Sequence, residues 1–289
     1  MDFISIILLT LSVILSVGRN LFSKDISGFS FGTKSFYLVQ AVTFFCGSLA
    51  LIIFGGFSGV SISALTAFYA IIYGVLLLSA QWCYTAALKT GTTGVCSTVY
   101  SLGFILPTIS GSLFWNEKIT LLNILGVLCV IPAIIISGTK SSAKGSTQNN
   151  KYIIPLIIAM LSSGGLGIMQ KIQQSSPYPE QKAAFVLIAF VFAAALSLIF
   201  YIFTKAKESS VLPKKLLSAS GIGICFGCCN LLNTTLAGRL DSAVFFPMQN
   251  ISAILLSLVF GILIYKEKIH KKELVVLLLG ILSILLLNI

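Results

Sequence analysis

Long apolar runs cover almost the whole chain, and no other feature of the sequence restricts the fold so strongly. Hydrophobic residues make up 57% of the 289 residues and charged residues 9%, against about 25% charged residues in a soluble domain. A membrane-spanning helix needs about 20 mainly apolar residues. Ten runs fit this requirement, at residues 3–22, 33–54, 64–88, 93–115, 120–138, 152–173, 182–203, 216–237, 242–264 and 272–288. We therefore expect lipid to surround most of the chain.

The pattern inside these runs favours helices over strands. A membrane β-barrel needs alternating strands of about ten residues, and the run "LNILGVLCVIPAIIISG" (122–138) does not alternate. We predict an all-α membrane protein with ten transmembrane helices. The first run follows Asp2 instead of a basic segment and has no small-x-small cleavage site. It is therefore expected to be a membrane helix and not a cleaved signal peptide.

A polar segment separates the runs into two groups of five. "SGTKSSAKGSTQNNK" (137–151) is rich in Ser, Gly and Asn, a composition typical of flexible linkers. We predict a first five-helix repeat at 1–138, a polar linker at 139–151 and a second five-helix repeat at 152–289. The repeat is visible in "NEKIT" (116–120) and "KEKIH" (266–270), because Glu117 and Glu267 are 150 positions apart (267 − 117 = 150) and Lys-Ile follows each.

Duplication of an odd number of spans has a topological consequence. The second copy enters the membrane from the opposite side, so the two copies become an inverted 5 + 5 repeat around a central cavity. Transporters commonly use this arrangement, with the binding site near the midplane between the repeats.

The duplicated motifs resemble a known family. "NEKIT" and "KEKIH" after the fourth and ninth spans, together with "YTAALKTG" (84–91) and "NTTLAGRL" (233–240), resemble the ten-span EamA-like family of the drug/metabolite transporter superfamily. The resemblance covers nearly the whole chain. It implies a carrier of small metabolites or drugs, with a cavity walled by spans 1, 3, 4, 6, 8 and 9 and with the fifth and tenth spans peripheral.

The acidic residues restrict the transport mechanism. All eight lie at span ends or in loops, at Asp2, Asp25, Glu117, Glu180, Glu208, Asp241, Glu267 and Glu273. An acid inside the membrane is normally functional, so its absence argues against a carboxylate proton relay and leaves a facilitator, an exchanger or another form of coupling. The repeated Glu117-Lys118 and Glu267-Lys268 are expected to form structural polar pairs in loops. Each glutamate would pair with a nearby lysine or accept backbone N–H groups at the start of the next helix.

Polar side chains within the spans are the candidates for substrate binding, because lipid disfavours them. We select Arg19, Asn20, Gln81, Tyr84, Tyr100, Asn230, Asn233, Gln249 and Asn250. The alternative for the amides is hydrogen bonding between helices. For Arg19 the alternatives are snorkelling to the headgroups and binding of a carboxylate or phosphate group at the cavity mouth.

The remaining composition predicts few partners other than lipid and a small-molecule substrate. The seven cysteines include "CFGCC" (225–229), but with His270 as the single histidine we expect neither a metal site, a disulfide nor a cofactor. The net charge of +11 comes from span ends and loops, so it fits membrane topology and not nucleic-acid binding. We expect a functional monomer, multi-pass in the cell inner or plasma membrane. The positive-inside rule places both termini outside the cell. The family resemblance implies the reverse orientation, with both termini inside.

Three other functions remain possible at this level: a lipid scramblase, a non-transporting membrane scaffold and a membrane-embedded lipid enzyme. An enzyme would need acids, histidines or a nucleophile–base pair gathered at one face. The single histidine and the scattered acids speak against that reading, so a carrier is the favoured interpretation and no enzymatic activity is expected.

Overall fold

A computed structural model describes residues 1–27, 33–55, 62–88, 96, 99–118, 120–138, 153–205, 213–265 and 271–288. These residues are built almost entirely from helices. The α-helices are α1 Phe3–Ser27, α2 Thr33–Phe54, α3 Ala64–Leu88, α5 Ile105–Trp115, α6 Leu121–Gly138, α7 Ile153–Gln174, α8 Lys182–Phe203, α9 Pro213–Ala237, α10 Ser242–Tyr265 and α11 Lys271–Asn288, with 3-10 turns η1 Leu102–Phe104 and η4 Pro179–Gln181. The predicted all-helical class is confirmed for this part of the chain, while the predicted linker at 139–151 lies outside it.

The helices follow the apolar runs closely. Six of them are long and apolar enough to cross a membrane, at Phe3–Ser23, Lys34–Phe54, Ala64–Ala87, Ile153–Gln174, Pro179–Phe203 and Pro213–Ala237, and shorter apolar helices complete the set. The fourth run differs from a regular helix because η1 precedes α5. Gly103 within η1 lies against the α7 backbone, where a Cβ would come within 2.6 Å of the Met160 carbonyl oxygen. The chain is thus a multi-pass membrane protein.

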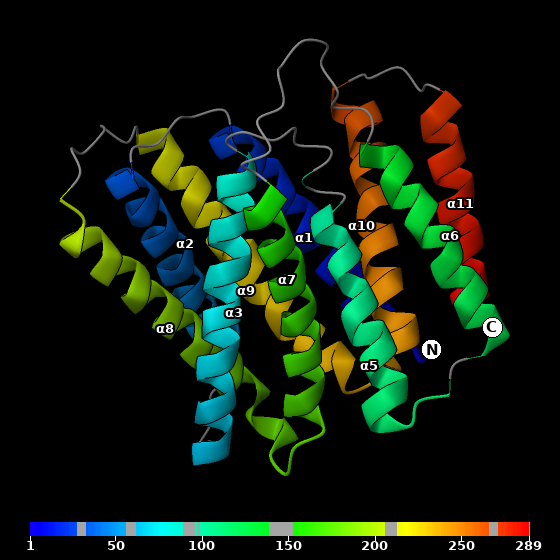
Figure 1. Ribbon diagram of the computed structural model, residues 1–289, viewed down its shortest axis with the longest axis horizontal. Helices are drawn as coiled ribbons and strands as arrows, with labels where there is room; N and C mark the ends of the chain where they lie inside the picture. Colours follow the sequence, from blue (N-terminus) through cyan, green and yellow to red (C-terminus); the bar gives the residue numbers. More distant parts are fainter. Residues whose placement is uncertain are drawn as a thin grey trace.

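Two groups of helices stand side by side (Figure 1). In the larger group α9 packs against α1 and α2, α3 packs against α7 and α8, and α2 packs against α8. In the smaller group α5 packs against α10, and α6 packs against α11 at the edge of the molecule. The groups meet where α1 contacts α10 and where α5 contacts α7.

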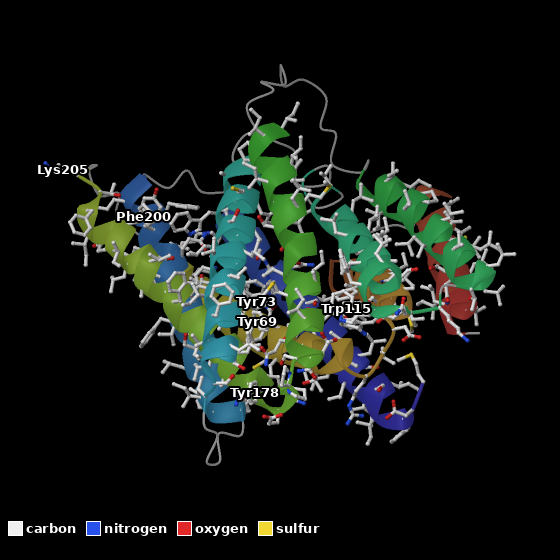
Figure 2. All side chains as sticks on the ribbon, turned by 60° about the horizontal axis from the view of Figure 1, so that its bottom comes forward. Tyr69, Tyr73, Trp115, Tyr178, Phe200 and Lys205 are labelled. Atoms are coloured by element: carbon white, nitrogen blue, oxygen red, sulfur yellow. The ribbon has the colours of Figure 1, made fainter. Side chains whose placement is uncertain are left out.

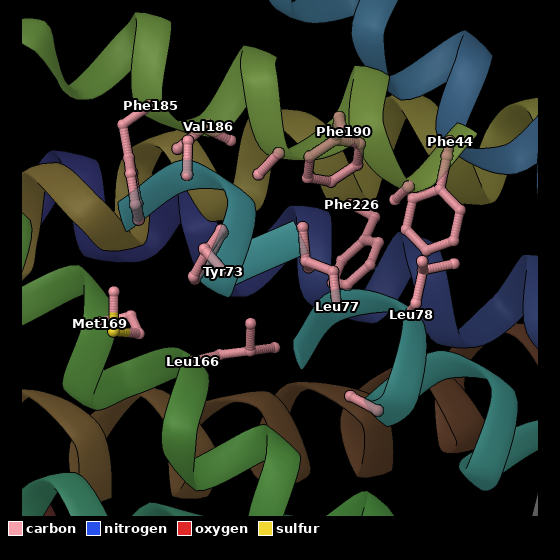
Figure 3. Close-up of a cluster of buried hydrophobic side chains, with 14 of the residues drawn as sticks. Phe44, Tyr73, Leu77, Leu78, Leu166, Met169, Phe185, Val186, Phe190 and Phe226 are labelled. Atoms are coloured by element: carbon pink, nitrogen blue, oxygen red, sulfur yellow. The ribbon is translucent and has the colours of Figure 1, made fainter. Parts of the chain in front are cut away.

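An aromatic cluster fills the centre of the larger group (Figure 3). Phe44, Phe185 and Phe190 are fully buried, and Phe190 makes edge contacts with Phe44 at 5.7 Å and with Phe226 at 5.4 Å between ring centroids. Such edge-to-face pairs add about 0.5–1.5 kcal/mol each beyond area burial. Large apolar side chains such as Phe203 are exposed on the outside of the bundle, which is the surface that lipid would cover.

A reciprocal cap fixes the start of α6. The Thr120 backbone N–H donates to Asn123 Oδ1 and the Asn123 backbone N–H donates to Thr120 Oγ1, both at 3.1 Å. These bonds satisfy backbone donors that a helix start otherwise leaves unpaired.

Removing this cap tests its contribution to stability. Thr120→Ala is expected to lower the free energy of unfolding by about 1 kcal/mol, because the Asn123 N–H loses its acceptor. Denaturant unfolding in detergent measures the change. Thr10→Ala is the matched control, since the exposed Thr10 hydroxyl only donates back to the Ile6 carbonyl of its own helix. Equal effects of the two variants would contradict the capping role.

Candidate functional site

Arg19 of α1 joins the two halves of the chain in the interior of the bundle. Its Nη2 donates to Gln81 Oε1 of α3 at 2.7 Å, and its Cζ lies 3.9 Å from the ring centroid of Phe226 on α9. Phe226 is near the middle of α9, which runs from residue 213 to 237. The guanidinium is therefore held inside the bundle by an amide oxygen and by a cation–π contact.

Two tyrosines extend this arrangement along α3. Tyr84 lies one helical turn after Gln81, and its ring centroid is 4.8 Å from that of Tyr100, with an angle of 47° between the rings. Both side chains are half-buried. The contact ties α3 to the helical residues that precede η1.

A second polar bridge joins α3, α7 and α9. The Tyr73 hydroxyl donates to Asn230 Oδ1 at 2.5 Å, and Gln170 Nε2 donates to the Tyr73 hydroxyl at 2.7 Å. Asn230 Nδ2 donates to the Phe226 carbonyl at 2.8 Å. All three side chains are buried. Figure 2 shows Tyr73 within the bundle, whereas Phe200 and Lys205 lie at the outer end of α8.

A third polar group joins α1, α9 and α10. The Ser12 hydroxyl donates to Asn233 Oδ1 at 2.5 Å, and Gln249 Nε2 donates to Ser12 Oγ at 3.0 Å and to Ser16 Oγ at 3.2 Å. The Cys229 thiol shares hydrogen bonds with both serines. Gln249 Oε1 is buried and has no hydrogen-bond partner among the described residues. An unsatisfied buried acceptor is costly.

Seven of the nine residues selected from the sequence fall into these three groups. Arg19 and Gln81 bond directly, Tyr84 and Tyr100 pack together, Asn230 belongs to the second bridge, and Asn233 and Gln249 meet through Ser12. The other two do not join them. Asn20 is exposed on α1, and Asn250 Nδ2 donates within its own helix to the Phe246 carbonyl at 2.9 Å.

The sequence selection missed several members of these groups, namely Ser12, Ser16, Tyr73, Gln170 and Cys229. A signal existed for the serines, because positions 12, 16 and 19 follow the i, i+4, i+7 spacing of one helix face. Gln170 was also visible as an amide inside the apolar run 152–173. Tyr73 and Cys229 gave no such signal, since both are common in apolar spans.

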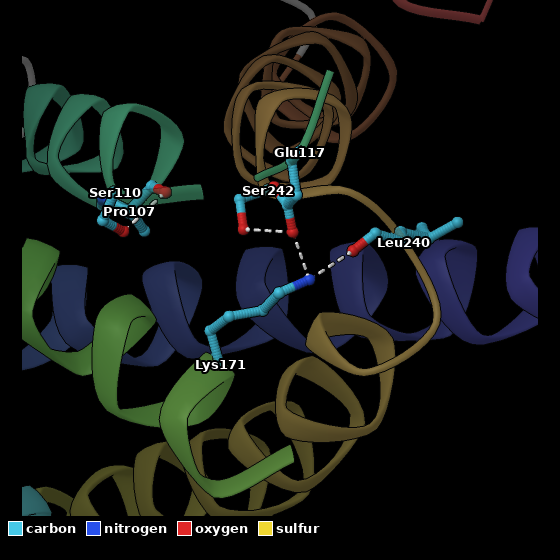
Figure 4. A network of polar contacts seen from close by, with 6 residues as sticks. All are labelled: Pro107, Ser110, Glu117, Lys171, Leu240 and Ser242. Carbon is cyan, nitrogen blue, oxygen red and sulfur yellow. Dashed lines mark hydrogen bonds and ion pairs between the residues drawn. The ribbon is translucent and has the colours of Figure 1, made fainter. Parts of the chain in front are cut away.

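A charged cluster lies where α5, α7 and α10 end or begin (Figure 4). The Glu117 carboxylate forms an ion pair with Lys171 and accepts the backbone N–H of Ser242, the first residue of α10, at 2.7 Å. The Lys171 ammonium also donates to the Leu240 carbonyl at 3.3 Å. The two charged side chains are only 6% and 12% exposed, respectively. Negative charge at a helix N-terminus is favourable.

This cluster gives Glu117 partners from the second half of the chain and not from its own loop. A left-handed Asn116, with φ of 51°, ends α5, and the Glu117 N–H bonds back to the Gly111 carbonyl at 3.3 Å. That turn aims the carboxylate at α10. Lys118, the expected partner in the loop, is exposed. Glu267 and Lys268 lie outside the described residues.

The described residues contain no group of three or more His, Cys, Asp or Glu side chains arranged for a metal ion. The cysteines of "CFGCC" are free, and Cys229 is engaged with serine hydroxyls. In the three polar groups of the described residues, the side chains are therefore amides, hydroxyls, a thiol and the Arg19 guanidinium. Such groups bind and orient a polar molecule.

Long apolar helices around an interior layer of polar side chains define an integral membrane protein of multi-pass type. Residues 150–289 match the model of the EamA-like transporter family. The family consists of membrane transporters of the drug/metabolite type, and the resemblance seen in the sequence is confirmed.

Comparison with solved structures extends the likeness to the whole chain. A protein described only as "Crystal structure of protein" superimposes with a TM-score of 0.77 at 16% identity, over 99% of this chain and 96% of its own. At that identity the likeness concerns the fold alone. No curated protein matches the sequence.

Proposed function

We propose that this protein transports a small polar metabolite or drug across the membrane by alternating access, without a mid-membrane carboxylate relay. The observation that carries the proposal is the interior polar layer, in which Arg19 and Gln81 of the first half meet Phe226 of the second half. All ten apolar helices span the membrane in this proposal. Residues 1–138 and 152–289 are two inverted five-helix repeats.

Reciprocal helix packing supports the inverted repeat. We equate α1, α2, α3, α5 and α6 with α7, α8, α9, α10 and α11. This turns each of the most extensive helix contacts into another one or into itself. The α1–α9 contact corresponds to α7–α3, and α2–α9 corresponds to α8–α3. The contacts α2–α8, α5–α10 and α6–α11 each correspond to themselves. A two-fold relation between the halves produces this pattern.

Equivalent residues at these crossings support the same relation. Gly74 and Gly223 are 149 positions apart (223 − 74 = 149), as are the starts of α3 and α9 (213 − 64 = 149). Gly74 lies against α8 at Ala189, and Gly223 lies against α2 at Thr43. Small residues permit such close helix contact.

The polar bridges repeat in the same way. Gln81 and Asn230 are also 149 positions apart (230 − 81 = 149). Each bonds to the first helix of its own half, Gln81 to Arg19 and Asn230 to Gln170. Two bridges related by the repeat are what a substrate site between inverted repeats requires.

In this proposal, ion pairs between the halves hold the transport pathway closed at one end. Glu117–Lys171 and Asp2–Arg239 each join a residue of 1–138 to a residue of 152–289. Both pairs lie where α1 and α10 begin and where α5, α7 and α9 end. Alternating access requires these contacts to separate when the pathway opens at that end. One chain contains both repeats, so we propose a working monomer in the cell inner or plasma membrane.

Uptake into proteoliposomes tests the proposal. The purified full-length protein is reconstituted and supplied with labelled amino acids, sugars, nucleotides, organic acids and cationic drugs. Wild-type protein should accumulate one chemical class. A variant combining Gln81→Leu, Asn230→Leu and Gln249→Leu should lose that uptake, because it removes amide donors and acceptors from the polar groups. Gln174→Leu, at the end of α7 where Gln174 donates to the Pro179 carbonyl, is the matched control.

Asn230 also accepts from Tyr73 and Gln170, so the triple variant is checked for folding by size-exclusion profile and melting temperature. Gln81→Leu alone is the second test if folding suffers. Undiminished uptake by a folded triple variant would refute the site. Absence of wild-type uptake for every class, together with scrambling of labelled lipid, would replace the proposal with a lipid scramblase.

A further inference from the structure

We propose that Arg19 binds a carboxylate or phosphate group of the transported molecule, so that the substrate class is an organic anion. This inference rests on the proposed transport function and specifies the ligand of the same polar layer. Four features of the described residues support it: the depth of the guanidinium, its neutral partners, its unused donors and its counterpart in the other half.

The guanidinium does not reach towards the membrane surface. Arg19 lies four residues before Ser23, where the apolar part of α1 ends (23 − 19 = 4), which is about 6 Å at the usual helical rise. A snorkelling side chain would extend along that distance. Instead its Cζ is held 3.9 Å from the Phe226 ring, near the middle of α9.

Arg19 has neutral partners in this position. Among the described side chains it contacts the Gln81 amide oxygen and the Phe226 ring, and no described carboxylate pairs with it. The Glu117 and Asp2 carboxylates pair instead with Lys171 and Arg239. A half-buried guanidinium without a carboxylate partner among the described residues is suited to a negative charge brought by a ligand.

The guanidinium also has donors to spare. It carries five N–H groups, and one hydrogen bond, to Gln81, engages it among the described residues. The ring contact uses the face of Phe226 and consumes no conventional donor. A planar guanidinium binds carboxylate and phosphate oxygens in pairs. Nearby, Gln249 donates to Ser16, one turn before Arg19, while its buried Oε1 lacks a partner and can accept from another group of the same ligand.

The second half shows that a positive charge is not needed to join these helices. There the bridge between the first and third helices uses Gln170 and Asn230, with no charge. Gln170 and Arg19 lie on corresponding helices, α7 and α1, although the 150-residue offset places position 170 opposite the exposed Asn20 (170 − 150 = 20). A glutamine therefore suffices as an interhelical clamp, and the arginine of the first half adds a function that the clamp does not require.

Matched probes test the charge of the ligand. Purified full-length protein is assayed for thermal stabilisation and proteoliposome uptake with phenylacetate, phenyl phosphate, phenethyl alcohol and phenethylamine, and with aliphatic sets of the same four types. The wild-type protein should respond to an anion and not to its alcohol or amine counterpart. The carboxylate and phosphate arms show which anion is bound.

Substitutions of Arg19 complete the test. Arg19→Gln, which imitates the neutral bridge of the second half, should weaken anion binding at least tenfold while the unliganded melting temperature stays near the wild-type value. Arg19→Lys should weaken it less, because the charge remains and the paired donors are lost. Lys205→Gln, at an exposed position just beyond the end of α8, should leave binding unchanged.

The outcomes separate this inference from the transport function. Wild-type uptake of neutral or cationic compounds alone would overturn the anion assignment and leave the transporter standing. Full anion binding by folded Arg19→Gln would overturn it as well. No uptake of any class by folded wild-type protein would remove both proposals.

Discussion

Glu117→Ala should lower the free energy of unfolding by about 3–5 kcal/mol, the range for breaking a buried ion pair. The substitution leaves the Lys171 ammonium, 12% exposed, without its carboxylate, and the Ser242 N–H at the start of α10 without its acceptor. Both losses fall at one contact between the two halves. Denaturant unfolding of the purified protein in detergent measures the change.

A second variant separates the charge from the packing. Combined Glu117→Leu and Lys171→Met should recover most of the loss, because replacing both members of a buried pair by apolar groups removes the uncompensated charge. Arg239→Gln is the control, since Arg239 and Asp2 are 43% and 56% exposed and such pairs contribute little. If Glu117→Ala and Arg239→Gln changed stability equally, the buried cluster would have no special role in holding the halves together.

Much of the fold follows from the sequence because the membrane imposes a simple condition. Every backbone polar group in lipid must be satisfied within its own segment, so every apolar run except the one at 93–115 becomes a helix of similar bounds. The run at 64–88 and α3 share both ends, and the run at 3–22 continues to Ser27 in α1. The added residues are "SKDIS" (23–27). They are mostly polar, so hydropathy does not predict them as part of a membrane span, yet they continue the helix.

The interior contacts could be predicted less completely. Spacing along a helix shows which residues share a face, so Gln81 and Tyr84 could be selected together. It does not show which helix crosses that face. The pairing of Gln81 with Arg19, and not with an amide, depends on how α1 and α3 sit against α9. The Glu117–Lys171 pair also spans both halves, which local charge pairing cannot reveal.

The α2–α9 crossing provides the other large expected effect. Gly223→Ala should lower the free energy of unfolding by about 3 kcal/mol, at the upper end of the range for overpacking. A Cβ at position 223 would overlap the Thr43 carbonyl oxygen and would lie 3.0 Å from the Gly47 nitrogen. Both atoms belong to the α2 backbone, so the helices must separate to relieve the contact. Denaturant unfolding measures the loss.

Gly165→Ala is the matched control on α7. Its Cβ would meet Leu76 Cδ1 at 3.2 Å and Cδ2 at 3.3 Å, which are the far ends of a flexible side chain. Helix interiors favour Ala over Gly by roughly 0.5–1 kcal/mol, so this variant should change stability little or raise it. A tolerated Gly223→Ala would mean that α2 and α9 are farther apart than described, and the proposed relation between this crossing and the one at Gly74 would then lose its physical basis. A large loss for Gly223→Ala alone would show that close backbone contact, and not glycine as such, is what this crossing requires.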